Sequence, residues 1–255
     1  MEPLIPQTTD VVILCGGRGA RLGDMTAHRP KPLLPVGGRP FLLRVLGRMK
    51  EEGFTRIILA VHYLAEQFRA FVSTCQELGL QVELVIEPKP LGTGGALRHA
   101  VQHIRSSTFV AMNGDSWIAQ PIGPVLAEHA RSQRVCTVVA VPAAQIEGQV
   151  LAKGRWHVGA DGEMLGFSTP GTIEEGWINA GLYVFSRELV LSWPNGAYSL
   201  EANFERLLSR ADAKVFRSTG WLLDIGTPEC YENAQRLLTS DGLPAPVLSL
   251  RSSEC

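Results

Sequence analysis

The sequence lacks long apolar runs, strong net charge and a secretory start. No apolar stretch among its 255 residues is nearly long enough to span a bilayer, so we do not expect the protein to be embedded in a membrane. The formal net charge of −1 provides no general field that would attract nucleic acid or an anionic membrane. Residues 1–10 show no cationic start followed by an apolar stretch, as a signal peptide would. We therefore expect a cytoplasmic protein with no nucleic-acid or membrane partner.

The sequence also lacks the cysteine spacing of a metal or disulfide protein. None of the cysteines forms a Cys-x-x-Cys pair. The five are scattered along the chain, at Cys15, Cys75, Cys136, Cys230 and Cys255. An odd, unclustered set is typical of reduced thiols, which argues against a disulfide framework and a cysteine zinc site.

The apolar pattern up to residue 141 predicts strands that alternate with helices. Strands are expected at 11–14, 56–61, 82–86, 109–112 and 135–141, and helices at 41–49, 64–78, 94–103 and 122–131. Such alternation is typical of a doubly wound, mostly parallel α/β sheet with helices on both faces. Ligands of these sheets bind at the carboxyl ends of the strands.

The pattern changes after residue 141. A strand meander is expected at 149–158, 164–167 and 178–185, and helices at 200–208 and 228–238. We expect one domain over 1–239, in which a nucleotide-binding part, about 10–141, continues into a small β-rich sugar-binding part, about 142–239. Residues 240–255 contain prolines and serines without periodicity, and we expect a flexible tail.

The segment 14–22 has the clearest functional pattern. Three glycines after a predicted strand leave backbone N–H groups open to a triphosphate, and Arg21 adds a fork of donors for phosphate oxygens. The glycines are Gly16, Gly17 and Gly19. A tight strand-to-helix turn is the alternative explanation for the glycines alone. The P-loop sequence is absent, and Leu22 stands where a dinucleotide fingerprint needs its third glycine. This disfavours a dinucleotide-dependent oxidoreductase.

Lys31 lies between two prolines, Pro30 and Pro32. The prolines stiffen the backbone and limit where the ammonium group can go. The functional interpretation is a cation placed on a phosphate, and the alternative is a solvated surface lysine. The bracketing prolines and the nearby glycine loop favour the functional interpretation.

Two further places could hold ligand. The run 91–96, Leu-Gly-Thr-Gly-Gly-Ala, is a second glycine loop that opens a helix, and it could bring a base or sugar close to bare backbone. Asp115 ends a predicted strand, and Asp224 lies in a turn far along the chain. The two carboxylates could converge on Mg²⁺, which favours one or two carboxylates together with substrate phosphates. Each aspartate alone is more often a cap or turn residue.

Together these motifs resemble the sugar-1-phosphate nucleotidyltransferases, over roughly residues 10–238. The resemblance rests on Gly16-Gly17-x-Gly-x-Arg21-Leu22, Pro30-Lys31-Pro32, Pro35-Val36-x-Gly38-x-Pro40, the run 91–96, Asn113-Gly114-Asp115, Asn179-Ala180-Gly181 and Trp221-x-x-Asp224-Ile225-Gly226-Thr227. It implies a Rossmann-like fold of the nucleotide-diphospho-sugar transferase type. The compact length and the stretch 113–116 look most like the heptose 1-phosphate guanylyltransferase branch.

The resemblance also implies roles for single residues. Catalytic roles fall on Arg21, Lys31, Asp115 and Asp224, with Mg²⁺ held by the two aspartates. Nucleotide contacts fall on Leu14, Gly16, Gly17, Gly19, Arg21, Glu87, Leu91, Gly92, Thr93, Asn113 and Gly114. Sugar contacts fall on Asn179, Asp115 and Gly95. The substrates implied are a nucleoside triphosphate, with GTP favoured, and a sugar 1-phosphate; a homodimer is left open.

Two departures from the family pattern stand out. Cys15 and Ala20 replace the more common alanine and threonine or serine of the first motif. The usual Phe-x-Glu-Lys-Pro is matched here by 166–170, so Ser168 and Thr169 replace the pair that would hold the sugar and its phosphate. Lys153 and Arg155 are candidate replacements, although a solvated strand face is the alternative for each.

The predicted reaction converts a nucleoside triphosphate and a sugar 1-phosphate to a nucleotide sugar and pyrophosphate. The leading interpretation is GTP with D-glycero-α-D-manno-heptose 1-phosphate, giving a precursor of surface polysaccharide. Mannose 1-phosphate guanylyl transfer, or uridylyl or thymidylyl transfer to another hexose 1-phosphate, is the alternative within the family. A nucleotide-sugar-sensing relative without turnover is the alternative from another class, and the missing Glu-Lys pair is its main support.

Overall fold

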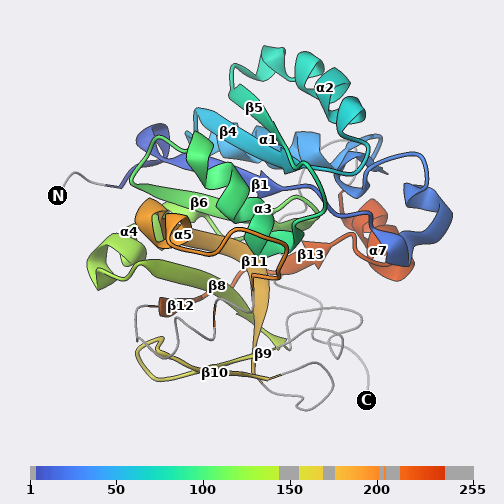
Figure 1. The fold of residues 1–255 in the computed structure, drawn as a ribbon. Helices are drawn as coiled ribbons and strands as arrows, with labels where there is room; N and C mark the ends of the chain where they lie inside the picture. Colours follow the sequence, from blue (N-terminus) through green and yellow to red (C-terminus); the bar gives the residue numbers. More distant parts are fainter. Residues whose placement is uncertain (1–3, 144–154, 169–175, 201–203, 205–212, 239–255) are drawn as a thin grey trace, which may run out of the picture.

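A mixed nine-stranded sheet forms the centre of the computed structural model (Figure 1), which describes residues 4–143, 155–168, 176–200, 204 and 213–238. Its strands are β1 (Asp10–Leu14), β4 (Arg56–Val61), β5 (Gln81–Ile86), β6 (Thr108–Asn113), β8 (Cys136–Pro142), β9 (Arg155–Val158), β10 (Met164–Ser168), β11 (Trp177–Ser186) and β12 (Ala213–Arg217). The main order is β10-β9-β11-β6-β1-β4-β5, and β8 pairs with β11 and β12.

The four strands β5, β4, β1 and β6 are parallel, as the alternating pattern predicts. In β1, β4 and β6 the residues form nearly continuous apolar runs because both faces of the sheet are buried there, whereas the edge strand β5 is only partly buried. In β1 the alternation is visible directly, since Val11 and Ile13 face one core and Val12 faces the other. The fold class predicted from the sequence is thereby confirmed.

Strand β11 was expected in a separate meander, but it lies inside the central sheet. It is antiparallel to β6 on one side and to β8 on the other. Strand β8, which is antiparallel to β11, therefore runs in the same direction as β6 without contacting it. The hairpin of β9 and β10 extends the sheet beyond β11 and forms the lower end of the molecule in Figure 1.

Helices cover both faces of the sheet. One face packs against α1 (Phe41–Glu51), α2 (Ala65–Thr74), α4 (Ile122–Ser132) and α7 (Pro228–Leu237), and the other against α3 (Gly92–Ala100) and α5 (Arg187–Leu191). Helix α2 ends earlier than predicted, and the short 3₁₀ turn Gln76–Leu78 follows it. The predicted strand at 149–154, most of the predicted helix 200–208 and the predicted tail lie outside the described residues.

Two small strand pairs are absent from the sequence prediction. Strand β7 (Ser116–Ile118) pairs with β13 (Leu222–Asp224), and β2 (Pro35–Val36) pairs with β3 (Arg39–Pro40). Strand β12 of the main sheet was also missed. These strands are short, and β7, β12 and β13 depend on pairing with segments far away in the sequence, which local periodicity does not show.

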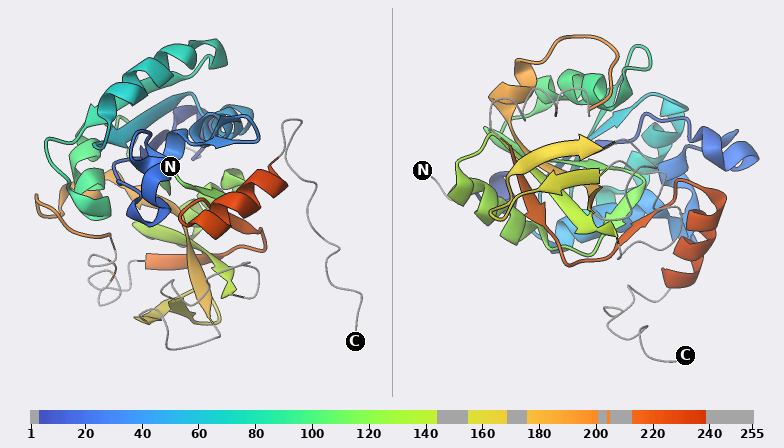
Figure 2. Two further views of the ribbon diagram at one scale, coloured as in Figure 1. Left: turned by 90° about the vertical axis from the view of Figure 1, so that its right-hand side faces the viewer. Right: turned by 90° about the horizontal axis from the view of Figure 1, so that it is seen from below.

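Helix α7 holds the β2–β3 hairpin against the rest of the fold. The Tyr231 hydroxyl and the Gln235 side-chain amide both donate to the Pro35 carbonyl oxygen, at 2.5 and 2.7 Å. The Gln235 side-chain oxygen also accepts from the Gly37 N–H at 2.9 Å. Figures 1 and 2 show α7 beside the N-terminal loop region coloured blue. The C-terminal helix thus fixes the backbone that follows Lys31.

Candidate active site

The first glycine loop lies against the carboxylate of Glu87. A Cβ atom at Gly16 would stand 2.3 Å from the Glu87 Oε1 atom, so no side chain fits there without moving that carboxylate. Glu87 is only 4% exposed, and its Oε2 accepts from the Leu91 N–H at 3.0 Å. Burial raises the pKa of Glu87, an effect opposed by the Leu91 N–H and by His62. The loop after β1 and the loop after β5 therefore converge at the carboxyl edge of the sheet, where ligands of such sheets bind.

The glycines of the second loop contact the protein's own backbone. Helix α3 begins at Gly92, two residues earlier than predicted, so the glycines form its first turn. The Gly94 and Gly95 N–H groups donate to the Tyr198 carbonyl oxygen, at 3.1 and 3.4 Å. A Cβ at Gly95 would stand 2.0 Å from the Gly196 carbonyl oxygen. These glycines thus make room for a segment of the chain itself, and the approach of a base or sugar to this loop stays a prediction.

The remaining members of the second loop are also placed. Leu91 is buried, and its carbonyl oxygen accepts from the Tyr198 N–H at 2.9 Å. The Thr93 hydroxyl accepts from the Leu200 N–H at 2.8 Å. Gly92 and Thr93 are exposed. In this loop, ligand binding stays a prediction for the exposed backbone of Gly92 and for Leu91, which contacts Glu87.

The turn after β6 lies directly beside the end of β1. The Gly114 N–H donates to the Leu14 carbonyl oxygen at 2.9 Å. A Cβ at Gly114 would stand 2.6 Å from the Cys15 Sγ atom. Burial, followed by the nearby Asp115 and Glu87 charges, raises the pKa of the Cys15 thiol well above its ordinary value. Cys15 is therefore a neutral packing residue beneath the site, and its departure from the family motif is a difference in packing.

Strands β7 and β13 bring together the backbones of the two predicted metal ligands. Asp115 immediately precedes β7, and Asp224 is the direct neighbour of Ser116 in the ladder. The Ile225 N–H donates to the Asp115 carbonyl oxygen at 3.0 Å. Two aspartates from distant parts of the sequence are thus adjacent, as predicted.

Arg21 reaches the same place from the first loop. A Cβ at Gly226 would stand 3.0 Å from Asp224 Oδ1 and 3.3 Å from an Arg21 terminal nitrogen. The Gly226 N–H donates to Asp224 Oδ1 at 2.9 Å. The Arg21 guanidinium group and the Asp224 carboxylate therefore both lie next to Gly226. A phosphate bound by Arg21 would there be close to a metal ion bound by Asp224.

Lys31 forms an ion pair with Asp115. Its side chain is 12% exposed, so the alternative of a solvated surface lysine is wrong. The stem of Lys31 also passes Gly19, whose left-handed backbone (φ of 68°) places the first loop beside it. The predicted phosphate cation and a predicted metal ligand thus form an ion pair with each other.

The Asn-Ala-Gly run of β11 lies beside Asn113. A Cβ at Gly181 would stand 2.5 Å from the Asn113 amide nitrogen. The Asn179 side-chain oxygen accepts from the Gly181 N–H at 3.1 Å, and its nitrogen donates to the Tyr183 hydroxyl at 2.7 Å. Asn179 is thereby held in a fixed orientation at the edge of the site. Its contact with a sugar stays a prediction.

The candidates for holding the sugar phosphate are only partly described. Lys153 and Thr169 lie outside the described residues, and the side chain of Ser168 is not described. Arg155 begins β9, is 2% exposed and interacts within the protein. The alternative of a solvated strand face is therefore wrong for Arg155, which lies beside Ile178 in the sheet.

Two residues of this region were missed from the sequence. The His62 ring nitrogen Nδ1 lies 3.1 Å from the Glu87 carbonyl oxygen. The Tyr63 hydroxyl donates to the Thr26 and Ala27 carbonyl oxygens, and the Arg18 guanidinium lies 5.3 Å from the Tyr63 ring centroid. Their position just after β4 is the signal that could have identified them, because this end of the sheet carries the other site loops.

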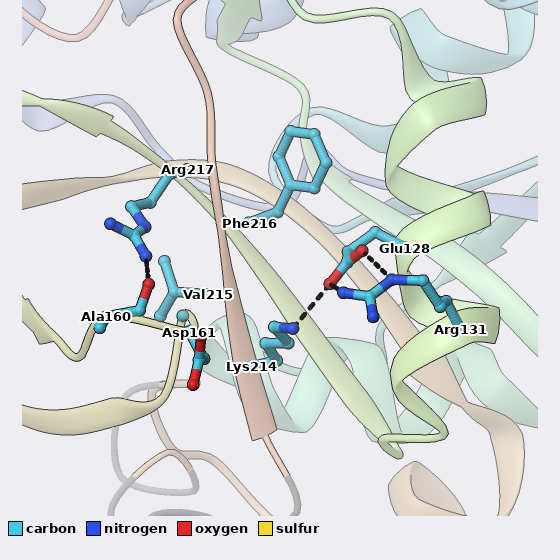
Figure 3. Close-up of a pocket in the computed structure, with 9 residues that line it drawn as sticks. Glu128, Arg131, Ala160, Asp161, Lys214, Val215, Phe216 and Arg217 are labelled. Carbon is cyan, nitrogen blue, oxygen red and sulfur yellow. Dashed lines mark hydrogen bonds and ion pairs between the residues drawn. The ribbon is translucent and has the colours of Figure 1, made fainter.

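A separate hollow of about 380 Å³ lies between α4, β12 and the β9–β10 turn (Figure 3). Its charges pair with one another, since Glu128 binds Arg131 at 2.8 Å and Lys214 at 2.7 Å. Arg217 donates to the Ala160 carbonyl oxygen. The residues of the predicted site do not line this hollow; its ion pairs join α4 to β12, and the Arg217 hydrogen bond joins β12 to the β9–β10 turn.

The family follows from a match that spans most of the chain. Residues 10–241 match the family described as nucleotidyl transferase. The chain belongs to the nucleotidyl transferase family. The matched range includes the glycine loop, Lys31, Asp115 and Asp224, so the family predicted by resemblance is confirmed.

Individual relatives of this nucleotidyl transferase cover nearly all of it. A mannose-1-phosphate guanylyltransferase of Mycobacterium tuberculosis is 32% identical, over 94% of this chain and 67% of its own length. A D-glycero-alpha-D-manno-heptose 1-phosphate guanylyltransferase of Aneurinibacillus thermoaerophilus is 27% identical, over 90% of this chain and 98% of its own length. The crystal structure of HddC from Yersinia pseudotuberculosis complexed with GMP-PN is 30% identical, with a TM-score of 0.78, over 89% of this chain and 98% of its own.

The described part of this nucleotidyl transferase contains no helix that is both long and apolar enough to cross a membrane.

Proposed function

We propose that this nucleotidyl transferase joins the guanylyl group of GTP to a heptose 1-phosphate and releases pyrophosphate. The observation that carries the proposal is the convergence of the first glycine loop, Glu87, Lys31 and the two aspartates at one edge of the sheet. Its relatives support the guanylyl group, because they include a heptose 1-phosphate and a mannose-1-phosphate guanylyltransferase. Mannose 1-phosphate is therefore the second candidate acceptor.

The chain supplies separate groups for the triphosphate. Gly17 is exposed, and a Cβ built there would meet nothing within 4 Å, so its backbone can face the phosphates. Arg21 would bind phosphate oxygens with its planar fork of donors. Lys31 would leave Asp115 and move its charge to the α-phosphate, where negative charge grows during transfer. The sugar phosphate oxygen is already a competent nucleophile near neutral pH, so no general base is required.

The two aspartates fit a divalent cation that shares its ligands with substrate. Among the described residues no group of three or more His, Cys, Asp and Glu could hold a metal by itself. Mg²⁺ commonly uses one or two protein carboxylates and fills its octahedral shell with phosphate oxygens and water. Asp115 and Asp224 would hold it. When bound it would neutralise phosphate charge between the two anionic reactants.

Glu87 is the candidate for selecting the base. One carboxylate oxygen is held by the Leu91 N–H, and the other faces Gly16 at the surface of the loop. Guanine presents two neighbouring N–H donors on its Watson–Crick edge, which match a carboxylate that can only accept. Glu87→Gln should therefore weaken the preference for GTP over other triphosphates, with retention of the fold as control.

A matrix of five nucleoside triphosphates against hexose, aminohexose and heptose 1-phosphates, with pyrophosphate as readout, tests the proposal. We expect the highest kcat/KM for GTP with heptose 1-phosphate, followed by mannose 1-phosphate. Higher kcat/KM with UTP or dTTP would refute the guanylyl assignment. Pyrophosphate release with no pair would refute transfer altogether and favour a sensing role.

The acceptor site can be tested in the same assay. Arg155→Ala and Lys153→Ala should raise the KM for the sugar 1-phosphate if either side chain holds its phosphate. If both variants leave that KM unchanged, these two residues are not the phosphate ligands.

A further inference from the structure

A buried arginine on helix α1 directs its donors to the strand beside the predicted metal site. Arg48 is 9% exposed. Its two terminal nitrogens donate to the Ile118 and Gln120 carbonyl oxygens, and its Nε donates to Glu52 at 2.7 Å. The guanidinium carbon lies 5.2 Å from the centroid of the Trp117 ring. Nearly every interaction of this cation is therefore made with β7 and the residues that follow it.

The arrangement requires an arginine. Two carbonyl oxygens from one short segment accept from two nitrogens of the same planar group, which a lysine ammonium cannot match. The carboxylate of Glu52, which balances the charge of Arg48, also contacts this segment, because its second oxygen accepts from the Ile122 N–H at 2.5 Å. Burial of a cation is costly unless such partners are present. The pair thus fixes the segment 117–122 to α1 at both ends.

The same segment adjoins both predicted metal ligands. Asp115 lies directly before β7, and Asp224 is paired with Ser116 in the ladder. Beyond β7 the Ala119 N–H donates to the Trp221 carbonyl oxygen at 2.9 Å. The Ser218 hydroxyl donates to the Gln120 side-chain oxygen, also at 2.9 Å. A displacement of β7 would therefore move Asp115 and, through the ladder, Asp224.

We propose that Arg48 is a positioning residue that holds β7 and β13 in the register that metal binding by Asp115 and Asp224 requires. The inference rests on the proposed function of these two aspartates. Neither Arg48 nor its partners belong to the motifs that carry the family resemblance, and Arg48 acts only through the backbone of the strand. Outer partners of metal ligands typically change metal affinity by about 10- to 100-fold when they are lost.

The test is a Mn²⁺ titration of the full-length protein, followed by electron paramagnetic resonance, with Mn²⁺ standing in for Mg²⁺. Arg48→Lys keeps the charge and removes the two-pronged contact. We expect its Mn²⁺ affinity to fall about 10-fold or more relative to the unmodified protein. In the assay the Mg²⁺ concentration for half-maximal turnover should rise by a similar factor.

Arg56→Lys is the matched control. Arg56 is equally buried (7% exposed) and ion-paired, but it lies at the start of β4, at the other end of the sheet. Both lysine variants should lower the free energy of unfolding, and only Arg48→Lys should weaken Mn²⁺ binding. Equal Mn²⁺ affinities in the two variants would overturn the inference.

Two further outcomes are separable. If Arg48→Lys does not fold, Ser218→Ala removes the Gln120 contact with a smaller change, and unaltered Mn²⁺ affinity in that variant would overturn the inference. If the unmodified protein and Asp115→Ala bind Mn²⁺ equally, Asp115 is not a metal ligand. That result would contradict the proposed function and, with it, the positioning role of Arg48.

Discussion

At the amino ends of β1, β4 and β5, charged side chains pair with one another, whereas at the carboxyl ends they surround open backbone. Asp10 at the amino end accepts from Arg56 at 3.0 Å and from the Arg105 and Ser106 N–H groups at 2.6 and 3.2 Å. Arg56 also binds Glu83 at 2.5 Å and the His103 carbonyl oxygen at 2.9 Å. This network, the amino-end cluster, satisfies its charges within the protein.

The carboxyl end carries the residues of the proposed substrate site. Lys31 and Asp115 neutralise each other there, but both have predicted partners in the substrate complex. Glu87 lies against Gly16, and Gly17 is open to solvent. The two ends of the same strands therefore differ in role. The amino end stabilises the fold, and under the proposed function the carboxyl end binds the substrates.

Asp115→Ala should have the largest effect, and it should lower turnover while the fold is retained. Loss of a metal carboxylate should lower kcat by about 1000-fold, or about 4 kcal/mol in activation free energy. Pyrophosphate release measures it. Asp161→Ala, which removes an exposed carboxylate from the separate hollow, is the control and should retain turnover. Near-normal activity in Asp115→Ala would contradict the metal role.

Arg56→Met should show the opposite behaviour. Removal of one partner from a buried ion pair should lower the free energy of unfolding by about 3 kcal/mol, because Asp10 is left buried without its cation. Urea denaturation measures this loss. At a temperature where the variant is folded, kcat/KM should match the unmodified protein. A large loss of kcat without loss of stability would contradict the assignment of a purely stabilising role to the amino end.

Gly16→Ala should have a smaller effect that is confined to the nucleotide. The added methyl group displaces the Glu87 carboxylate, and we expect the KM for GTP to rise about 10-fold, as for a contact worth about 1.4 kcal/mol. Steady-state kinetics with varied GTP measures it. Gly123→Ala in α4, where a Cβ meets nothing within 4 Å, is the control and should leave the KM unchanged. An unchanged KM in Gly16→Ala would remove Glu87 from the nucleotide site.

The smallest effect is expected in the pH dependence of stability. Burial raises the pKa of Glu83, but the hydrogen bonds from His103 and Arg56 outweigh it and lower that pKa below its ordinary value. Glu83 therefore stabilises the fold above its unfolded-state pKa of about 4.3. The contribution is lost as the pH falls through the lower folded pKa. Urea denaturation below about pH 4.3 should show a weaker pH dependence in Glu83→Gln; an identical slope would show that Glu83 is not part of the amino-end cluster.

The sequence predicted the elements whose residues are buried on both sides. Strands β1, β4 and β6 are nearly continuous apolar runs, and α1 and α4 show helical spacing, so local patterns were sufficient. The place of β11 was not predicted, because pairing between distant segments decides which strands become neighbours. Strands β7 and β13 were missed for the same reason, although they determine the distance between Asp115 and Asp224.

The candidate site was predicted to a similar degree. The motifs identified Gly16, Lys31 and the aspartates, but not the ion pair between Lys31 and Asp115, which depends on side-chain conformation. The glycines of α3 read as a ligand loop, although Tyr198, far along the chain, accepts from their N–H groups. Arg48 reads as an ordinary helical arginine, and only the tertiary structure shows that it contacts β7.

Transfer of label from GTP carrying ³²P at the α-phosphate tests the central claim most directly. With Mg²⁺ and heptose 1-phosphate, we expect the label to appear in a nucleotide sugar, and ³²P at the γ-phosphate to appear in pyrophosphate. Label that remains in GTP, or that is released as GMP with no nucleotide sugar formed, would contradict guanylyl transfer at the carboxyl end of this sheet.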